Sequence, residues 1–309
     1  MAAPLFRIGT RGSPLALWQA NAVRDGLLAA LGAEPDAVEI VAIRTTGDAI
    51  QDRPLSEAGG KGLFVKEIDE ALLDGRVHLA VHSAKDLPTD LAPGTTLAAT
   101  LKRADVRDAL IGGAAATVDA LPRGAVVGTA SLRRGALARR SRPDLKVVPF
   151  RGNVQTRLDK LARGEVDATL LALAGLTRLG LQAHATEILD EDTFPPALGQ
   201  GAVAVTARAG DEATLEALRN LDCPDTAAAL LCERAFLKVL DGSCRTPIAG
   251  LARVSGGALR FKGLVLSEDG AREVAGEASG PASDAEALGA EAGRDVKART
   301  PADLLAAFG

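Results

Sequence analysis

Short apolar runs alternate with amphipathic segments along the first two thirds of the chain. Leu79–His82 and Ala168–Leu173 are continuous apolar runs of strand length, and Val38–Thr45 alternates as a strand does. Between them, Leu15–Leu31 and the segment from about Phe64 to Leu73 have the apolar spacing of helices with one buried face. Because strands that alternate with helices form parallel sheets, this pattern predicts an α/β fold whose ligands bind at the carboxyl ends of the strands.

Two short segments resemble each other, and each follows a predicted strand. They are Gly9–Ser13 (GTRGS) and Gly128–Ser131 (GTAS). Ser13 is a natural N-cap, and Pro14 suits the first position of the following helix. The likeness indicates two similar lobes facing one cleft, and a strand predicted at Ala202–Ala207 is placed to return the chain to the first lobe.

The character of the chain changes after Pro224. A helix is predicted to run from there to about Leu240. Ile248–Val254 and Leu259–Leu266 then read as antiparallel strands, and the Gly256-Gly257 pair between them is typical of a hairpin. With a further helix at Ala285–Lys297, the tail is predicted to form a separate small α+β domain.

Composition limits the class of protein. The chain has 309 residues, of which 47% are hydrophobic, so it can bury real cores and should divide into two or three domains. Lys plus Arg number 36 against 40 Asp plus Glu, aromatic residues make up 3%, and Tyr is missing. A general nucleic-acid binder would be basic and would offer aromatic stacking platforms, so no nucleic-acid partner is expected.

The terminus and the cysteines point to a compartment. The first residues lack the long apolar run of a signal peptide, and no stretch reaches transmembrane length, so we expect no membrane contact. The three cysteines show no C-x-x-C spacing and cannot all pair, which fits a reducing cytoplasm. The three histidines supply no zinc set, so no metal is expected.

Basic side chains are concentrated between Gly128 and Arg157, in a chain that is acidic overall. This stretch contains eight of them against one acid, Asp144. They are Arg133, Arg134, Arg139, Arg140, Arg142, Lys146, Arg151 and Arg157. Glycines and hydroxyls lie among them. Guanidinium groups, hydroxyls and exposed backbone N–H groups together suit a ligand with several carboxylates or phosphates.

The predicted elements divide these arginines into two groups. Arg139, Arg140 and Arg142 fall on a helix and its exit, where we expect a solvated face. Other arginines lie at junctions of a loop and a helix, where free N–H groups and the helix dipole favour anions. Such junctions are occupied by Arg133, Arg134, Arg151, Arg157, Arg11 and Arg178.

Asp86 is a candidate catalytic carboxylate. It follows a buried strand and lies beside Lys85 and close to Ser83. A carboxylate there can accept N–H donors of a ligand and stabilise a developing cation. The alternative is an aspartate that opens the turn Asp86-Leu87-Pro88.

The three cysteines are predicted to have different roles. Cys244 lies in a glycine-flanked loop beside Arg245, whose charge lowers the thiol pKa and favours the thiolate nucleophile. A structural thiol is the equal alternative. Cys232 lies in an apolar helical run and is predicted to pack in a core, and Cys223 at a helix start is predicted to be inert.

A glycine-rich loop precedes the predicted helix at Phe64. Its residues are Gly59, Gly60, Lys61 and Gly62. The loop lacks the spacing G-x-x-x-x-G-K-[ST] of a phosphate-binding loop, so a lid over the cleft is the better interpretation.

Seven short segments follow one another in an order and spacing that is highly specific as a set. They are residues 7–16 (RIGTRGSPLA), 59–64 (GGKGLF), 82–88 (HSAKDLP), 128–134 (GTASLRR), 151–154 (RGNV), 198–201 (LGQG) and 242–247 (GSCRTP). Together they resemble the porphobilinogen deaminase family of tetrapyrrole biosynthesis over nearly the full length. The resemblance implies two periplasmic-binding-protein-like (type II) lobes around a cleft and a small C-terminal α+β domain. The implied boundaries are residues 1–101 with 200–220 for the first lobe, 102–199 for the second, and 221–309 for the domain that carries the cofactor.

The resemblance also implies a role for individual residues. It places the catalytic carboxylate at Asp86 and the thioether attachment of a dipyrromethane cofactor at Cys244. The implied cofactor-binding residues are Ser83, Lys85, Asp86, Thr129, Ser131, Arg133, Arg134 and Arg157. The implied substrate-binding residues are Arg11, Ser13, Arg151, Arg157, Arg178 and Gln200. Two positions depart from the family pattern, Ala84 and Arg245, and the second is expected to alter how readily the thiol is loaded.

The implied chemistry agrees with the residues. Porphobilinogen is a pyrrole with two carboxylates and an aminomethyl group, and loss of ammonia leaves an electron-poor ring that Asp86 would stabilise. Four additions and a hydrolysis would release hydroxymethylbilane and keep the cofactor. Each added ring brings two carboxylates, and buried carboxylates need partners, which explains the excess of arginine.

Two other functions stay open at the level of sequence. A non-catalytic two-lobed protein that binds carboxylates or phosphates would bind reversibly and form no covalent adduct. A cysteine hydrolase would need a His base near Cys244, and none lies close in sequence. Besides porphobilinogen, the resemblance suggests uroporphyrinogen-III synthase as a transient partner, and a monomer.

Overall fold

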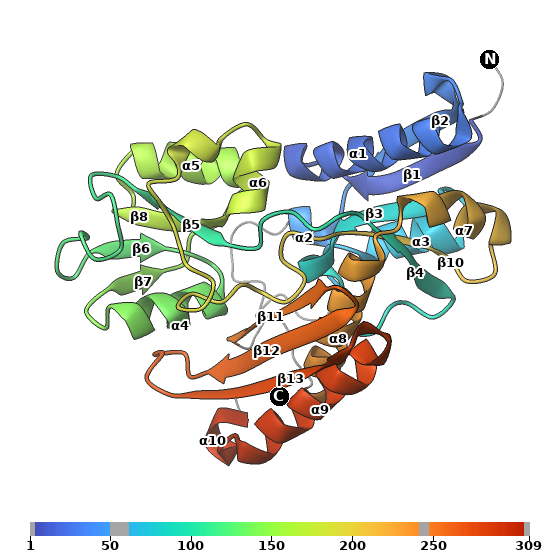
Figure 1. The fold of residues 1–309 in the computed structure, drawn as a ribbon. Coiled ribbons are helices and arrows are strands. Elements are labelled where there is room, and N and C mark those ends of the chain that lie inside the picture. Colours follow the sequence, from blue (N-terminus) through green and yellow to red (C-terminus); the bar gives the residue numbers. More distant parts are fainter. Residues whose placement is uncertain (1–3, 50–61, 241–246, 306–309) are drawn as a thin grey trace.

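The structure is a computed structural model that describes residues 4–49, 62–240 and 247–305. In these ranges the chain forms two lobes, each built on a five-stranded sheet, and a third unit built on a three-stranded sheet. The lobes lie side by side, and the third unit, in orange and red, packs beneath them (Figure 1). Two α/β lobes with a small antiparallel α+β unit is the architecture predicted from the sequence.

The first lobe is built on a sheet with the strand order β2-β1-β3-β10-β4. Its strands are β1 (Phe6–Arg11), β2 (Val38–Ile43), β3 (Leu79–Ser83), β4 (Thr95–Thr100) and β10 (Val203–Arg208). β1 is parallel to β2 and β3, whereas β10 is antiparallel to β3 and β4. Its helices are α1 (Pro14–Leu31), α2 (Thr46–Ala49), α3 (Lys66–Leu73) and α7 (Glu212–Leu218). Sheet and α1 share a core that includes Ile8, Leu27 and Leu79.

Helix α1 begins and ends where its sequence predicts. The Ser13 hydroxyl accepts a hydrogen bond from the backbone N–H of Ala16 at 3.3 Å, and Pro14 takes the first helical position. The helix ends at Gly32, whose φ of 59° is left-handed and costs glycine little. The strand–turn–helix unit therefore places Arg11 and Ser13 together at the carboxyl edge of the sheet.

The second lobe is built on a sheet with the strand order β7-β6-β8-β5-β9. Its strands are β5 (Asp108–Gly112), β6 (Val126–Gly128), β7 (Lys146–Val148), β8 (Ala168–Ala172) and β9 (Glu187–Ile188). β6 is parallel to β7 and β8, and β5 is antiparallel to β8 and β9. Its helices are α4 (Leu132–Ser141), α5 (Val154–Ala162) and α6 (Leu173–Arg178).

The two sheets have the same plan. Each has three parallel strands, with an antiparallel strand beside the third of them. β1 corresponds to β6, so Gly9–Ser13 and Gly128–Ser131 lie at the carboxyl ends of equivalent strands. The similarity of the lobes that these two segments predicted is confirmed.

The chain crosses between the lobes twice. It leaves the first lobe after β4 and returns to it with β10. The strands of the first sheet fall within residues 1–101 and 200–220, and those of the second within 102–199. The domain boundaries themselves stay a prediction.

The third unit is an antiparallel sheet with helices packed on one face. The strands are β11 (Ile248–Ser255), β12 (Ala258–Leu266) and β13 (Glu273–Pro281), in that order, and the helices are α8 (Pro224–Val239), α9 (Ala285–Arg299) and α10 (Ala302–Leu305). Gly256 and Gly257 turn the β11–β12 hairpin with φ values of 58° and 77°, as the sequence predicts. Helix α8 lies so close to α9 that a Cβ on Gly289 would be 2.0 Å from the carbonyl oxygen of Cys232.

The opposite face of this sheet packs on the second lobe. Leu264 and Leu266 share a core cluster with Leu137 of α4. The guanidinium of Arg139 donates to the carbonyl oxygen of Glu268 at 2.9 Å, and Arg140 pairs with Glu273. The third unit therefore covers part of the face that was predicted to be solvated, and both arginines are half-buried. Arg142 is half-buried for a different reason, because its guanidinium binds Asp144 of the same lobe at 2.8 and 2.9 Å.

Short 3₁₀ turns complete the described chain at Pro35–Ala37, Ala84–Asp86, Gln182–His184, Arg219–Leu221 and Ala282–Asp284. None of the helices within the described ranges is long and apolar enough to span a bilayer. Among the same residues, no three His, Cys, Asp or Glu side chains gather as metal ligands would.

Candidate active site

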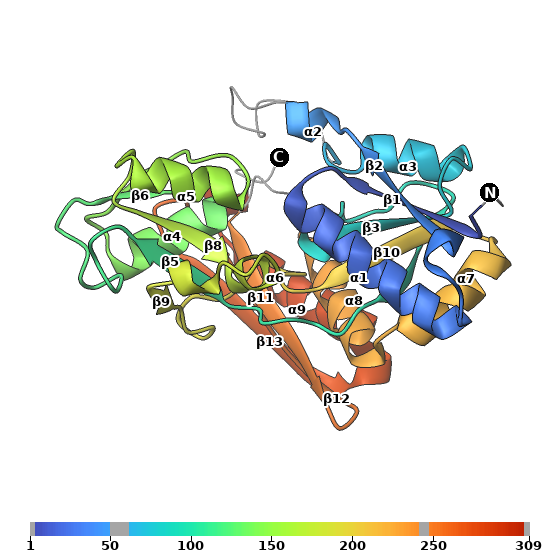
Figure 2. The same cartoon turned by 90° about the horizontal axis from the view of Figure 1, so that it is seen from above.

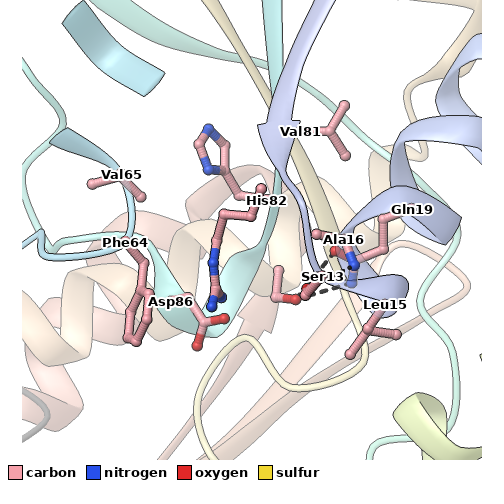
Figure 3. A pocket seen from close by; sticks show the side chains of 11 residues that line it. Ser13, Leu15, Ala16, Gln19, Phe64, Val65, Val81, His82 and Asp86 are labelled. Atoms are coloured by element: carbon pink, nitrogen blue, oxygen red, sulfur yellow. Dashed lines mark hydrogen bonds between the residues drawn. The ribbon is translucent and has the colours of Figure 1, made fainter. Parts of the chain in front are cut away.

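A pocket opens at the carboxyl ends of β1 and β3, beside the start of α1 (Figure 3). It is lined by Arg11, Ser13, Leu15, Ala16, Gln19, Phe64, Val65, Val81, His82, Ser83 and Asp86. Four of the predicted site residues are thus together in one place: Arg11, Ser13, Ser83 and Asp86. The apolar side chains supply walls with few competing donors, and the polar ones come from two separate chain segments, residues 11–19 and 82–86.

Gln19 is a site residue that the sequence reasoning missed. Its side chain is buried, and its amide nitrogen donates to the Ser83 hydroxyl at 2.9 Å, which joins α1 to the end of β3. The signal was present in the sequence, because a glutamine interrupts the buried face of α1 between Ala16 and Val23. Buried polar groups need partners, and Ser83 is the partner here.

The guanidinium of Arg11 is stacked on an aromatic ring. Its carbon lies 4.2 Å from the centre of the Phe64 ring, a cation–π geometry. Phe64 in turn lies against Gly47, where a Cβ would be 2.5 Å from the ring. The predicted lid immediately precedes this point. Gly59, Gly60 and Lys61 lie outside the described residues, and Gly62, with φ of 87°, opens the turn that leads to Phe64.

Asp86 and Lys85 lie on the 3₁₀ turn that follows β3. The half-buried Asp86 lines the pocket, and the Lys85 ammonium lies 3.5 Å from the side-chain oxygen of Gln200. Burial, together with the positive charge of Arg134, lowers the pKa of Lys85 to about 8, although Asp86 and Asp108 act in the opposite direction. An anionic ligand beside Lys85 would therefore stabilise its protonated form.

His82 is buried in the wall of the pocket and is neutral at physiological pH. Burial and the charge of Arg11 lower its pKa to about 4. Its Nε2 lies 3.2 Å from the hydroxyl of Thr206, with the direction of the hydrogen bond set by the tautomer.

Arg133 and Arg134 are held by a carboxylate that the sequence reasoning missed. Asp108, at the start of β5, is completely buried, and its oxygens lie 2.7 Å from a nitrogen of each guanidinium. Burial alone would raise the pKa of Asp108, but the two arginine charges and their hydrogen bonds hold it well below its usual range. Arg133 also donates to the carbonyl oxygen of Pro195 at 2.7 Å, and Arg134 to that of Leu170 at 3.1 Å.

Thr129 and Ser131 shape the start of α4. The Ser131 hydroxyl accepts a hydrogen bond from the backbone N–H of Arg134 at 3.3 Å and so caps the helix. The Thr129 hydroxyl accepts from the backbone N–H of Ser131 at 3.1 Å. This is the helix terminus that the sequence predicted as an anion site.

Like charges gather beside this terminus. Burial and the charges of Arg134 and Arg151 lower the pKa of Arg157 to about 10. Arg157 donates through Nε to the carbonyl oxygen of Gly152 at 2.9 Å. Neighbouring positive charges that lower one another's pKa favour the binding of an anionic ligand, because the anion offsets their repulsion.

Arg178 reaches from α6 of the second lobe to the first. It donates to the carbonyl oxygen of Gly201 at 2.8 Å, and its guanidinium carbon lies 5.4 Å from the centre of the Trp18 ring on α1. The two helices lie close together where the lobes meet (Figure 2). Burial lowers the pKa of Arg178.

Gln200 is completely buried between the lobes. Its amide nitrogen donates to the carbonyl oxygen of Val106 at 2.8 Å and to Asp108 at 2.9 Å. The expectation that it contacts substrate stays a prediction.

The structure describes two of the three cysteines. Cys232 is completely buried in the core of the third unit, and burial, with the charge of Glu233, raises its pKa to about 12. The prediction of a core thiol is confirmed. Cys223 is half-buried before α8, and the predicted attachment residue Cys244 and its neighbour Arg245 lie outside the described residues.

Comparison with known proteins places this chain in a family. A model of the porphobilinogen deaminase dipyromethane cofactor binding domain matches residues 6–216, and a model of the porphobilinogen deaminase C-terminal domain matches residues 227–298. The chain belongs to the porphobilinogen deaminase family. It is 56% identical over 295 residues to a porphobilinogen deaminase of Nitrobacter hamburgensis, covering 96% of this chain and 93% of that one. It is 55% identical to the Nitrobacter winogradskyi porphobilinogen deaminase over the same shares.

Two periplasmic proteins are among the solved structures that resemble the chain. The periplasmic VFT2 domain of Bordetella pertussis BvgS matches 70% of this chain and 86% of its own, with 19% identity and a TM-score of 0.39. An arginine-specific periplasmic binding protein of Salmonella typhimurium matches 72% and 95%, with 12% identity and a TM-score of 0.38.

The residues present fit the cofactor of the porphobilinogen deaminase family. A dipyrromethane carries carboxylates on both rings, and the site offers cations from both lobes. Arg133 has a buried Nε without a hydrogen-bond partner among the described residues, and Arg157 lies in a field of like charge. Both features suit a polycarboxylate. Ser83, Lys85, Thr129 and Ser131 add donors near the same strand ends.

Proposed function

We propose that the protein deaminates porphobilinogen and joins four units head to tail on a dipyrromethane primer, which Cys244 holds through a thioether. Hydrolysis then releases hydroxymethylbilane. Membership of the porphobilinogen deaminase family supports the activity. The observation that carries the assignment of residues is the pocket in which Asp86 lies beside Arg11, Ser13 and Ser83.

Asp86 is assigned the catalytic role. As porphobilinogen loses ammonia, positive charge develops on the pyrrole, and a carboxylate beside the ring stabilises that charge and accepts its N–H. The apolar walls formed by Leu15, Phe64 and Val65 keep water away, which strengthens the interaction. Removing one such preorganised group typically costs about 10²–10³-fold in rate.

The basic side chains are assigned to the acetate and propionate groups. Arg11 and Ser13 serve the substrate from the first lobe, and Arg151, Arg157 and Arg178 serve it from the second. Paired charges are essential here because a buried carboxylate without a partner is costly. Lids close over such sites in many enzymes, and the loop Gly59–Gly62 is assigned that part.

The cofactor is assigned to the start of α4 and the end of β3. When bound, the dipyrromethane supplies the free pyrrole α-carbon that attacks the activated substrate. Thr129, Ser131 and Lys85 offer donors to its carboxylates, and Arg157 adds a cation whose pKa would recover beside an anion. Arg133 and Arg134 form the buried floor of this region, fixed by Asp108.

An intact-mass measurement tests the assignment. The purified active enzyme should be heavier than its sequence by two porphobilinogen-derived units, and peptide mapping should place them on Cys244. Cys244→Ser should have the mass of the bare chain and no activity, whereas the matched control Cys223→Ser should keep both adduct and activity. An active wild-type enzyme with the bare mass would contradict the assignment, and reversible binding without turnover would favour the two-lobed binding protein instead.

The proposal also includes the cellular compartment of the protein and a partner protein. The absence of paired cysteine motifs supports a reducing cytoplasm, which cell fractionation checks. Direct transfer of the product to uroporphyrinogen-III synthase predicts that a chemical trap captures less free hydroxymethylbilane when the synthase is present. Equal capture with and without the synthase argues against direct transfer.

A further inference from the structure

A tight turn lies where the three units of the molecule meet. Gly199 and Gly201 both have left-handed backbones, with φ of 76° and 83°. A Cβ on Gly199 would be 2.8 Å from the backbone nitrogen of Lys85, and one on Gly201 would be 2.7 Å from the carbonyl oxygen of Ala104. The turn of residues 199–201 therefore lies directly against the reactive loop (residues 83–86) on one side. On the other side it lies against the first crossover, residues 101–107, which joins β4 to β5.

The side chain between these glycines points into the second lobe. Gln200 donates to the Asp108 carboxylate at 2.9 Å and accepts, at 3.5 Å, from the Lys85 ammonium of the reactive loop. The main chain makes the same connection, since the backbone N–H of Ala84 donates to the carbonyl oxygen of Ala202 at 3.0 Å. Gln200 thus contacts both lobes and is completely buried.

Asp108 continues the path to α4. It accepts hydrogen bonds from Arg133 at 2.7 Å and from Arg134 at 2.7 and 3.1 Å. None of these four residues, counting Gln200, is more than 6% exposed. In a buried setting such polar networks hold a defined geometry, because any broken contact leaves an unsatisfied group.

We propose that Gln200 and Asp108 are positioning residues that couple the reactive loop of the first lobe to the basic start of α4 in the second. The inference rests on the proposed function, because both ends of the path belong to that site. A ligand with several carboxylates must meet cations from both lobes at fixed separations, and two crossover segments alone leave the lobes free to shift. The path from Lys85 through Gln200 and Asp108 to α4 sets that separation.

The charges around Lys85 give the proposal an independent signal. Asp86 and Asp108 favour its protonated form, while Arg133, Arg134 and burial oppose it. The oxygen of Gln200 adds an acceptor for the ammonium. Gln200→Met keeps the length and volume of the side chain but removes this acceptor and the bond to Asp108, so the pKa of Lys85 should fall further.

Competitive amine labelling of the holoenzyme across a pH series, read by peptide mass spectrometry, measures the Lys85 midpoint directly. In Gln200→Met we expect that midpoint to fall by about one pH unit. We also expect kcat to fall about 10- to 100-fold with little change in KM, because the reacting groups are misplaced while the arginines that hold the substrate carboxylates remain. Asp108→Asn should act in the same direction, and if it does not fold, Gln200→Met carries the test.

Thr226→Val is the matched control. Thr226 is buried in the same junction and accepts one hydrogen bond, from the backbone N–H of Arg103 at 3.0 Å, but the bond lies off the path to Lys85. It should leave the Lys85 midpoint and kcat as in the wild type. An unmoved Lys85 midpoint in Gln200→Met, or equal losses in both variants, overturns the proposal. The labelling result does not depend on turnover, so it separates this failure from a missing adduct on Cys244.

Discussion

Arg103 and Glu233 form a bidentate ion pair between the first crossover and helix α8. The two nitrogen–oxygen distances are 2.7 and 3.1 Å, and the Glu233 side chain is completely buried. The same carboxylate accepts the backbone N–H groups of Gly199 at 2.5 Å and Ala252 at 2.8 Å. One side chain therefore binds the crossover, the 199–201 turn and the sheet of the third unit.

Glu233→Gln should destabilise the protein strongly. Removing one partner of a buried pair leaves an uncompensated charge on Arg103, which costs about 3–5 kcal/mol. Urea unfolding followed by circular dichroism measures the loss. Glu165→Gln is the control, because the Glu165–Arg163 pair is exposed and should contribute at most about 1 kcal/mol. Equal unfolding midpoints for the two variants would show that the Glu233 carboxylate does not hold the crossover, the 199–201 turn and the third unit together.

Asp86→Asn should keep the fold and lose the reaction. The substitution removes a negative charge but little volume, and we expect kcat to fall at least about 10²–10³-fold with an unchanged melting temperature. Product formation under saturating porphobilinogen measures the effect. Asp90→Asn, a few residues along, alters an exposed pair with Lys238 and should remain active. Normal turnover in Asp86→Asn would assign the catalytic role to another group.

Arg157→Leu should weaken ligand handling without loss of stability. Arg134 and Arg151 already depress the pKa of Arg157, so its removal relieves repulsion in the free protein. Binding of the growing chain should weaken by about 2–5 kcal/mol if a desolvated charge pair is lost. Single-turnover incorporation of porphobilinogen, with a melting curve, checks both parts, and the exposed Arg163→Leu is the control. A large fall in melting temperature would mean that Arg157 is structural.

His82 should make the protein less stable as the pH falls. Its folded pKa of about 4 lies below the ordinary 6.5, so the unfolded chain takes up a proton first. The contribution is complete above pH 6.5 and is lost as the pH falls toward 4. Between pH 7 and 5 the loss is on the order of 2 kcal/mol.

Urea unfolding at both pH values measures this term. His82→Gln should reduce the difference by that amount, whereas His184→Gln, at an exposed position, should leave it unchanged. The same pH dependence in all three proteins would show that His82 titrates normally.

Local patterns were sufficient for much of the fold. Helix α1 starts at its Ser13 cap and ends at Gly32, and the hairpin turns at Gly256-Gly257, because these are short-range properties of the backbone. β4, β5, β9 and β13 were not predicted. β13 reads EVAGEASGP, which has little apolar alternation, so only its pairing along the whole of β12 makes it a strand.

Part of the candidate site was likewise predictable from local patterns, and part was not. Arg11, Ser13, Ser83 and Asp86 were found from sequence because each follows a strand, and parallel strands end at one edge of a sheet. Asp108 could not be found, since it meets Arg133 and Arg134 only when β5 pairs antiparallel with β8. The partial cover of Arg139 and Arg140 could not be found either, because it comes from residues more than a hundred positions away.

The amino-acid sequence alone determined the family, the two similar lobes and the residues that carry charge and chemistry. Those properties depend on the order of short motifs and on backbone preferences within a few residues. Only the tertiary structure decided which cations are held by protein carboxylates and which face the pocket, and that Gln200 lies between the lobes. Burial and charge pairing depend on which distant segments meet, and these meetings are set by packing of the whole chain rather than by any local pattern.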